Sequence, residues 1–384
     1  MAFGRTWARR AAGLAACWLA TATAQPVLTV KIGHAATTSG WASVVGIESE
    51  NAARLAIERL NTTSLRIDGR QAHFELVTDD DQDTEAGARR AAQALLRAGV
   101  SAVVGHMTSG TTIAAGRLYA EAGIALIAPS ATVPELRRQG PATSFRLVAD
   151  DRQVAQLLGL HAVQQLGLRR FAVLDDGSVY GRGLAEQFTM AVRAAGARVV
   201  EQRRIEPDAE DFGEFLEAAA ERAADAVVFG GFDPQAGQLL RQMNLRGLRA
   251  RFITGDGPCT PDLVSYHAIG AAMDDQVLCA LPGGMPGGDD PAIAAFVGAY
   301  ARRFGAEPRF YGAHVHDAVL LIADAMQRAG TAEPARVLEA LASTAGFTGL
   351  TGTITFDERG ERVRPPLGLY TYRGELRRLV RTVR

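Results

Sequence analysis

Residues 101–120, SAVVGHMTSGTTIAAGRLYA, come close to a phosphate-binding loop in the types and spacing of their residues. Such a loop needs two glycines separated by four residues, then a lysine and a serine or threonine, because the lysine ammonium meets the phosphates. Gly105, Gly110 and Thr112 satisfy this spacing, but Thr111 stands at the lysine position. A neutral hydroxyl cannot replace that charge, so the segment does not predict a triphosphate site.

Motifs for cofactor binding and catalysis are also incomplete or absent. The turn GHAATTSGW, after the first expected strand, has glycines only at its two ends, which excludes the three-glycine dinucleotide fingerprint. No G-x-S-x-G elbow surrounds Ser109, and we find no nucleophile paired with a base. We therefore predict that the protein is not an enzyme and uses no cofactor.

Two groups of possible metal ligands have simpler explanations. A calcium loop beginning at Asp79 would need a glycine at position 84 and an acid at position 90, where Thr84 and Arg90 stand. We interpret DDDQD at 79–83 as a solvated strand end, followed by a helix cap at Thr84. His314 and His316 would share a face only on a strand, and the pattern around them predicts a helix. We therefore predict no metal site.

Hydroxyl groups and one acid follow several expected strands. Ser109 begins an expected helix, whose free backbone amides and partial positive charge attract an anion. Thr132 precedes a second helix start, and the backbone carbonyl of Ser130 beside it is a hydrogen-bond acceptor. Asp256 follows a strand in the second half of the chain and supplies a negative charge. An anion-binding end and a cation-binding end suit a zwitterion, although each hydroxyl alone is also explained as a helix cap.

The elements that must position these residues alternate regularly. Short apolar runs such as VLTVKIG, SAVVG and DAVVFGG are separated by amphipathic helices, first before residue 150 and again after it. Two such series predict two doubly wound α/β lobes with parallel sheets that are covered on both faces. Ligands then bind beyond the carboxyl ends of the strands. We expect the late strands GTITFD and LGLYTYR at the lobe edges, and helices at 47–60, 84–98, 110–122, 152–166, 181–195, 211–222, 234–246, 291–304, 312–329 and 334–343.

The composition and the N-terminal residues limit the possible functions further. The 384-residue chain is 47% hydrophobic and carries a net charge of −1, which argues against a nucleic-acid partner. Residues 1–24 have the basic leader, short apolar run and small-residue site of a cleaved export signal, with Gln25 as the first mature residue. LAAC at 14–17 also resembles a lipoprotein box that would lipidate Cys17, but the apolar run before it is short. We favour cleavage after residue 24 and a periplasmic location.

Two cysteines remain after such cleavage, Cys259 and Cys279. Export would permit a disulfide, but spacing along the chain does not show that the two Cα atoms come within bridging range. We expect two buried free thiols.

Several segments together carry a resemblance to a known family. VVGHMTSGTT, IAPSATVPEL, YGRGLAEQF, FGGFDPQAGQLLRQMNLRGL and TGDG are similar to segments of the periplasmic leucine/isoleucine/valine-binding proteins. These are the solute receptors of branched-chain amino acid ABC transporters. The resemblance covers nearly the whole chain after the leader.

The resemblance implies an architecture and a function. The fold would be two Rossmann-like lobes joined by three hinge crossovers, near 149, 282 and 358. The N-terminal lobe would comprise 26–149 plus 283–357, and the C-terminal lobe 150–282 plus 358–384. The protein would be a monomeric receptor for an amino acid, branched-chain or aliphatic, that delivers it to an inner-membrane ABC permease. A receptor for an aromatic acid or amide, or a ligand-sensing protein, are the alternatives.

The resemblance also implies residue roles. Ser109 would bind the ligand carboxylate, Thr132 the carboxylate and ammonium, and the Ser130 carbonyl the ammonium. Tyr180 would lie on the cleft face of the second lobe, and Asp256 would pair with the ammonium.

The chain departs from the family pattern at several positions. The family usually has glutamate at 256 and often a hydroxylated aromatic at 232, where this chain has Asp256 and Phe232. A family disulfide would join the positions of Gln82 and Thr108, which are not cysteines. We expect an apolar side-chain pocket formed by Trp41, Met107 and Phe310, with Thr108 as a polar contact.

Overall fold

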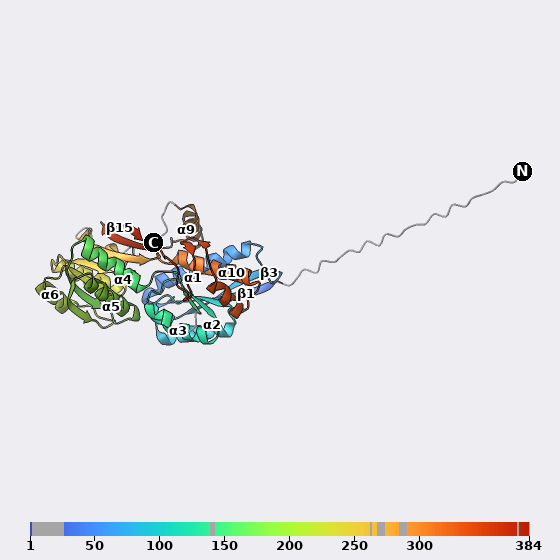
Figure 1. Ribbon diagram of the computed structural model, residues 1–384, viewed down its shortest axis with the longest axis horizontal. Coiled ribbons are helices and arrows are strands. Elements are labelled where there is room, and N and C mark those ends of the chain that lie inside the picture. The colour runs from blue at the N-terminus through green and yellow to red at the C-terminus, as the bar shows by residue number, and fades with distance from the viewer. Residues whose placement is uncertain are drawn as a thin grey trace.

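The computed structural model describes residues 27–138, 143–261, 263–266, 273–283, 290–374 and 376–383, together with Met1. Figure 1 shows two α/β lobes side by side along the longest axis of the molecule. Apart from Met1, the expected leader at 1–24, including Cys17, lies outside the described residues. Within the described part of the chain, no helix is both long and apolar enough to cross a membrane.

The first lobe is built on a six-stranded sheet in the order β2-β3-β1-β4-β5-β6. All pairings are parallel except that of β2 with β3. Neighbouring residues of β4 face opposite sides, so Val103 packs with α2 and α3, whereas Val104 packs with α1 and α10. Helices therefore cover both faces. The bounds are β1 Leu28–Ala36, β2 Arg66–Ile67, β3 Arg70–Asp80, β4 Ala102–Gly105, β5 Ala125–Ala128, β6 Ser144–Arg146, α1 Ser43–Thr62, α2 Glu85–Ala98, α3 Ser109–Glu121 and α10 Gly312–Ala329.

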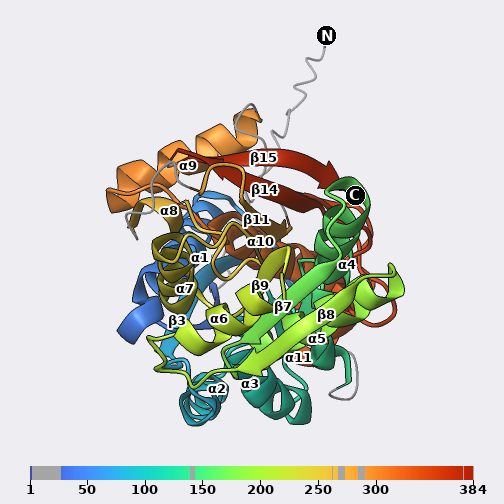
Figure 2. The same ribbon diagram turned by 90° about the vertical axis from the view of Figure 1, so that its left-hand side faces the viewer.

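The second lobe is built on a seven-stranded sheet in the order β15-β14-β11-β10-β9-β7-β8. Figure 2 shows this lobe facing the viewer. Val173 of β7 packs with α4 and α5, and Leu174 packs with α6 and α7 on the other face. The bounds are β7 Arg170–Asp175, β8 Arg198–Arg204, β9 Ala226–Gly230, β10 Arg251–Thr254, β11 Val277–Pro282, β14 Leu367–Arg373, β15 Leu376–Val383, α4 Asp151–Leu160, α5 Val179–Ala194, α6 Gly213–Glu221, α7 Asp233–Leu245 and the short α8 Leu263–Tyr266.

The chain passes between the two sheets three times. It leaves the first sheet after β6 and enters α4 of the second lobe. After β11 it returns to α9 (Pro291–Phe304), α10 and α11 (Pro334–Ala342), whose buried residues join the core of the first lobe. After β13 (Gly352–Ile354) it enters β14 and β15 at the edge of the second sheet. This is the expected architecture of two doubly wound lobes with three crossovers.

Each helix expected from apolar periodicity is present, with ends within a few residues of the expected positions. Side-chain caps set several of these ends, including Thr84 before α2 and Ser178 before α5. The helix expected at 152–166 divides into α4 and a π-helical turn, η3 (His161–Gln165). LGLYTYR forms β14, which lies between β11 and the outermost strand β15. The expected edge position is wrong for GTITFD, because its β13 pairs with β12 (Phe347–Gly349) in a separate ribbon and its Phe356 forms an isolated bridge with Arg362.

The expectation of two free thiols is wrong, because Cys259 and Cys279 form a disulfide with their Cα atoms 5.6 Å apart. Cys259 lies in the loop after β10, and Cys279 lies on β11. These strands are parallel neighbours, so the sheet brings the two residues within bridging range.

Candidate functional site

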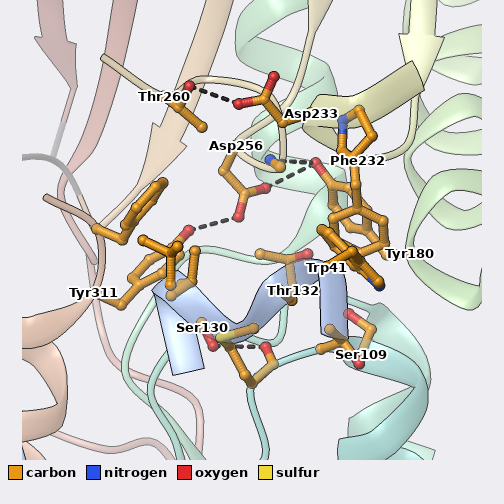
Figure 3. A pocket seen from close by; sticks show the side chains of 18 of the residues that line it. Trp41, Ser109, Ser130, Thr132, Tyr180, Phe232, Asp233, Asp256, Thr260 and Tyr311 are labelled. Atoms are coloured by element: carbon orange, nitrogen blue, oxygen red, sulfur yellow. Dashed lines mark hydrogen bonds between the residues drawn. The ribbon is translucent and has the colours of Figure 1, made fainter. Parts of the chain in front are cut away.

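A cavity of about 630 Å³ lies between the two lobes, beyond the carboxyl ends of strands from both sheets. Figure 3 shows the side chains that surround it. The structure brings all nine predicted site residues to its wall: Trp41, Met107, Thr108, Ser109, Ser130, Thr132, Tyr180, Phe232 and Asp256. Phe310, expected in the apolar pocket, also lines the cavity.

The amino end of α3 forms one wall. Thr108 is the N-cap residue and Ser109 the first residue of this helix. The Thr108 hydroxyl accepts a hydrogen bond from the Thr111 amide, which leaves the amides of Ser109 and Gly110 without acceptors inside the helix. The Ser109 hydroxyl is nearly buried and accepts a weak hydrogen bond, 3.4 Å, from the Val133 amide. This wall can therefore donate several hydrogen bonds to an anion.

Thr108 has a second role that the sequence did not indicate. Its hydroxyl donates to Oδ1 of Asp83 at 2.8 Å, while the Trp41 indole donates to Oδ2 of the same carboxylate at 3.1 Å. Burial raises the pKa of Asp83, and the hydrogen bonds from Thr108 and Trp41 oppose this rise. Thr108 therefore joins the start of α3 to the loop that precedes α2.

The interpretation of 79–83 as a solvated strand end is wrong for Asp81, although the Thr84 cap is confirmed. Asp81 is fully buried and hydrogen-bonds to Thr37 at 2.7 Å and to His106 at 2.8 Å. His106 in turn contacts the Tyr119 hydroxyl at 3.1 Å. Burial alone would raise the pKa of Asp81, but the hydrogen bonds from His106 and Thr37 outweigh it and lower this pKa. Asp81 thus ties together three segments behind the cavity.

The loop after β5 supplies Ser130 and Thr132. The Ser130 hydroxyl donates to the carbonyl of Met107 at 2.7 Å, so it binds the neighbouring cavity loop. Thr132 is 1% exposed, and its carbonyl accepts a hydrogen bond from the Asp151 amide at 2.9 Å. A helix was expected to begin after Thr132. The structure confirms it as a short 3₁₀ helix, η2 (Pro134–Arg138).

Asp256 forms the acidic part of the cavity. Its Oδ1 accepts a hydrogen bond from the Tyr180 hydroxyl at 2.9 Å, and its Oδ2 accepts one from the Tyr311 hydroxyl at 2.6 Å. Burial raises the pKa of Asp256, while the two tyrosine hydroxyls oppose this rise. No basic side chain lies among the described residues of the cavity wall, so a cationic group of a ligand would meet this carboxylate directly.

The sequence did not predict Tyr311, which lines the cavity, or Asp151, which interacts electrostatically with Asp256. Tyr311 is the residue before α10 in the first lobe, and the head-group residues were expected only in loops that follow strands. The sequence feature that could have indicated it is an aromatic residue at the start of an apolar helix. Asp151 is fully buried at the start of α4, where a hydrogen bond from the Thr132 side chain lowers its pKa but does not outweigh burial. Burial raises the pKa of Asp151 well above its usual range, and the charge of Asp256 adds to this rise.

Aromatic rings form the remaining wall and span the two lobes. The Trp41 and Phe232 rings are 5.1 Å apart, and the Phe232 and Tyr180 rings are also 5.1 Å apart. Trp41 remains 50% exposed, so this wall reaches the mouth of the cavity. The site combines a hydrogen-bond-donating helix end, an acid and an apolar wall, which is a binding geometry. Within the described cavity wall no histidine or lysine stands by Ser109 to activate it.

The chain is similar to known proteins of one family. Residues 29–375 match the family described as periplasmic binding protein. A Leu/Ile/Val-binding protein homolog 1 of Brucella abortus is 30% identical over 89% of this chain and 90% of its own length. A leucine-, isoleucine-, valine-, threonine-, and alanine-binding protein of Pseudomonas aeruginosa is 30% identical over 87% of each chain.

Solved structures show the same fold. The branched-chain amino acid transporter substrate-binding protein LivJ of Streptococcus pneumoniae, solved with isoleucine, superposes with a TM-score of 0.81 at 26% identity. The alignment covers 92% of this chain and 99% of that one. Residues 29–375 include every residue of the cavity wall described above and all of the second sheet except β15. The chain therefore belongs to the periplasmic binding protein family, among relatives that include Leu/Ile/Val-binding proteins.

Proposed function

We propose that this protein is a receptor that captures an α-amino acid between its two lobes and delivers it to an ABC permease. One observation carries the proposal: the cavity has hydrogen-bond donors at the end of α3 and a carboxylate, Asp256, on the other lobe. An α-amino acid carries a carboxylate and an ammonium, which match these two walls. We assign the protein no catalytic role.

In the proposed complex, the ligand carboxylate accepts hydrogen bonds from the Ser109 hydroxyl and the free amides of α3. The ammonium meets Asp256, the Thr132 hydroxyl and the Ser130 carbonyl. Tyr180 and Tyr311 hold the Asp256 carboxylate in place, because both donate hydrogen bonds to it. The rings of Trp41 and Phe232, with Met107, Thr108 and Phe310, enclose the side chain of the ligand.

Branched-chain and other aliphatic amino acids are the first candidate ligands. The Brucella and Pseudomonas relatives are named for binding such amino acids, and the Streptococcus protein was solved with isoleucine. An apolar, ring-lined wall is compatible with these side chains.

The proposal extends to the assembly in which the receptor works. The N-terminal lobe would be 26–149 plus 283–357, and the C-terminal lobe 150–282 plus 358–384. Ligand would close the lobes by hinge motion at the three crossovers, and the permease would recognise the closed monomer. Export by a leader at 1–24 would place the receptor in the periplasm.

Isothermal titration calorimetry tests the proposal with L-leucine, L-isoleucine and benzoate as probes. We expect the two amino acids to bind and benzoate not to bind, because Asp256 repels an anion that has no ammonium. Ser109→Ala and Asp256→Ala should abolish amino-acid binding, whereas Ser64→Ala, on an exposed turn, should bind normally. Unchanged affinity in both site variants would refute the head-group assignment, and binding of benzoate alone would favour an aromatic-acid receptor.

A further inference from the structure

Arg146, the last residue of β6, is a buried charge that the proposed mode of ligand binding does not use. Its side chain is fully shielded from solvent, and it does not line the cavity. A guanidinium removed from water is costly to the folded protein unless its N–H groups meet acceptors. The contacts of Arg146 therefore indicate what this charge does.

On one side, the Arg146 guanidinium holds the segment that carries Thr132. Its Nη1 donates to the carbonyl of Val133 at 2.8 Å and to that of Ala131 at 3.4 Å. The carbonyl of Thr132 itself accepts a hydrogen bond from the Asp151 amide at 2.9 Å. Three consecutive carbonyls are thus bound, although this segment belongs to no strand or helix.

This segment presents Thr132 to the cavity. A threonine side chain is stiff about χ1, so a fixed backbone leaves its hydroxyl few directions. The hydroxyl donates to Asp151 and retains lone pairs that can accept a hydrogen bond from a ligand ammonium. In Figure 3 Thr132 lies between Ser109 and Asp256. The Val133 amide donates to the Ser109 hydroxyl at 3.4 Å, so the position of this segment affects the contacts to both ends of the head group.

On the other side, Arg146 binds the third crossover. Its Nε and Nη2 donate to the two carboxylate oxygens of Glu361 at 2.9 and 2.7 Å, which is the bidentate geometry of a strong charge-assisted pair. The Arg146 amide also donates to the Gly360 carbonyl at 2.9 Å, and the Arg146 carbonyl accepts from the Arg362 amide at 3.2 Å. Because β6 ends at Arg146, the first and third crossovers meet at this residue.

We propose that Arg146 is a positioning residue for ligand binding: with Glu361 it holds the segment that directs Thr132 at the ammonium, and it links this segment to two hinge crossovers. The inference rests on the proposed function, because that function assigns Thr132 to the head group of an amino acid. The guanidinium does not touch the ligand. It acts through the carbonyls of Ala131 and Val133, so its effect on affinity depends on the Thr132 hydroxyl.

Calorimetry with L-leucine tests this role in two variants that disturb the pair from opposite ends. Glu361→Gln keeps the shape of the side chain but removes its charge and one acceptor oxygen. Arg146→Lys keeps the charge but lacks the planar fork that meets the carboxylate and the two carbonyls together. Each variant should weaken L-leucine binding about fivefold or more while it retains the circular dichroism spectrum of the unaltered protein.

Arg328→Gln is the matched control. The Arg328 guanidinium also donates to a backbone carbonyl, that of Ala340 at 2.6 Å, but it joins α10 to α11. None of its hydrogen-bond partners within the described chain lies in the cavity wall. This substitution should change the affinity for L-leucine by less than about twofold.

A double-mutant cycle with Thr132→Val separates positioning from a general loss of stability. Valine keeps the branched shape but has no hydroxyl to direct at the ammonium. We expect Thr132→Val alone to weaken L-leucine binding about tenfold, and Glu361→Gln to add less than about twofold in that background. A general loosening of the fold would instead reduce the affinity by the same factor in both backgrounds.

The outcomes distinguish this inference from the proposed function. If L-leucine binds but neither Glu361→Gln nor Arg146→Lys weakens its binding, the positioning role is refuted and the receptor stands. The same holds if Glu361→Gln has an equal effect with and without the Thr132 hydroxyl. If neither L-leucine nor L-isoleucine binds to the unaltered protein, the proposed function fails and the positioning role falls with it.

Discussion

Asp151 and Asp256 are two carboxyl groups close enough to interact electrostatically, and Asp256 lines the cavity. They differ in their partners. Asp256 accepts hydrogen bonds from two tyrosine hydroxyls, whereas Asp151 is fully buried with the Thr132 side chain as its hydrogen-bond donor. Asp256 can therefore keep its charge and pair with a ligand cation, while the charge of Asp151 is costly to the folded protein.

Asp151→Asn should make the ligand-free protein more resistant to urea at pH 8, by about 1 kcal/mol or more. Burial raises the folded-state pKa of Asp151, so the native protein loses stability as the pH rises through that pKa. The advantage of the variant should shrink towards pH 4, where the natural carboxyl group is protonated. Urea unfolding at several pH values measures this, with the exposed Asp208→Asn as control. An advantage that does not vary with pH would contradict the explanation.

At the scale of elements, the site depends on how helices begin after strands. The start of α3 presents amides to the cavity, and the start of α4 anchors the first crossover beside Thr132. Asp150 caps α4 in a reciprocal arrangement: its side chain accepts from the Gln153 amide at 3.0 Å, and the Gln153 side chain accepts from the Asp150 amide at 3.1 Å. Such a cap fixes where the second lobe begins.

Asp150→Ala should lower the free energy of unfolding by about 1 to 2 kcal/mol, because the amides of the first turn of α4 lose their acceptor. Asp150→Ser is the matched comparison, since a serine hydroxyl can still cap the helix. It should recover part of the loss, although the ion pair with Arg152 is absent. Chemical denaturation followed by circular dichroism measures both variants, and equal losses in the two would show that the cap is not the cause.

At the scale of the whole molecule, the two lobes meet around the cavity. Trp41 is the only tryptophan after residue 25, and its ring contacts Phe232 of the opposite lobe while half exposed to solvent. Its emission therefore reports on the mouth of the cleft. No other tryptophan obscures the signal once the leader is removed.

A chain that begins at Gln25 should change its tryptophan emission when an amino acid binds, with a shift to shorter wavelength as water is displaced from the mouth. The change should saturate at the ligand concentrations at which calorimetry shows full occupancy. Phe232→Ala should reduce the change, because the interlobe ring contact is lost. Constant emission at saturating ligand would contradict a closure that involves Trp41.

The sequence by itself determined the fold class, the helices and most of the cavity wall. Apolar periodicity depends only on neighbours two to four residues apart, and in a parallel sheet the residues after strands meet at one edge. Ser109 and Thr132 could therefore be placed at one sheet edge before any contact was known, and the family resemblance added Asp256 from the other lobe.

Only the tertiary structure shows which residues far apart in the chain come into contact. Cys259 and Cys279 bond because β10 and β11 are neighbours in the sheet, and Tyr311 reaches Asp256 because the chain returns to the first lobe. The burial of Asp151 depends on the same three-dimensional arrangement. So does the volume of the cavity, because it is set by distances between segments that lie far apart in the chain.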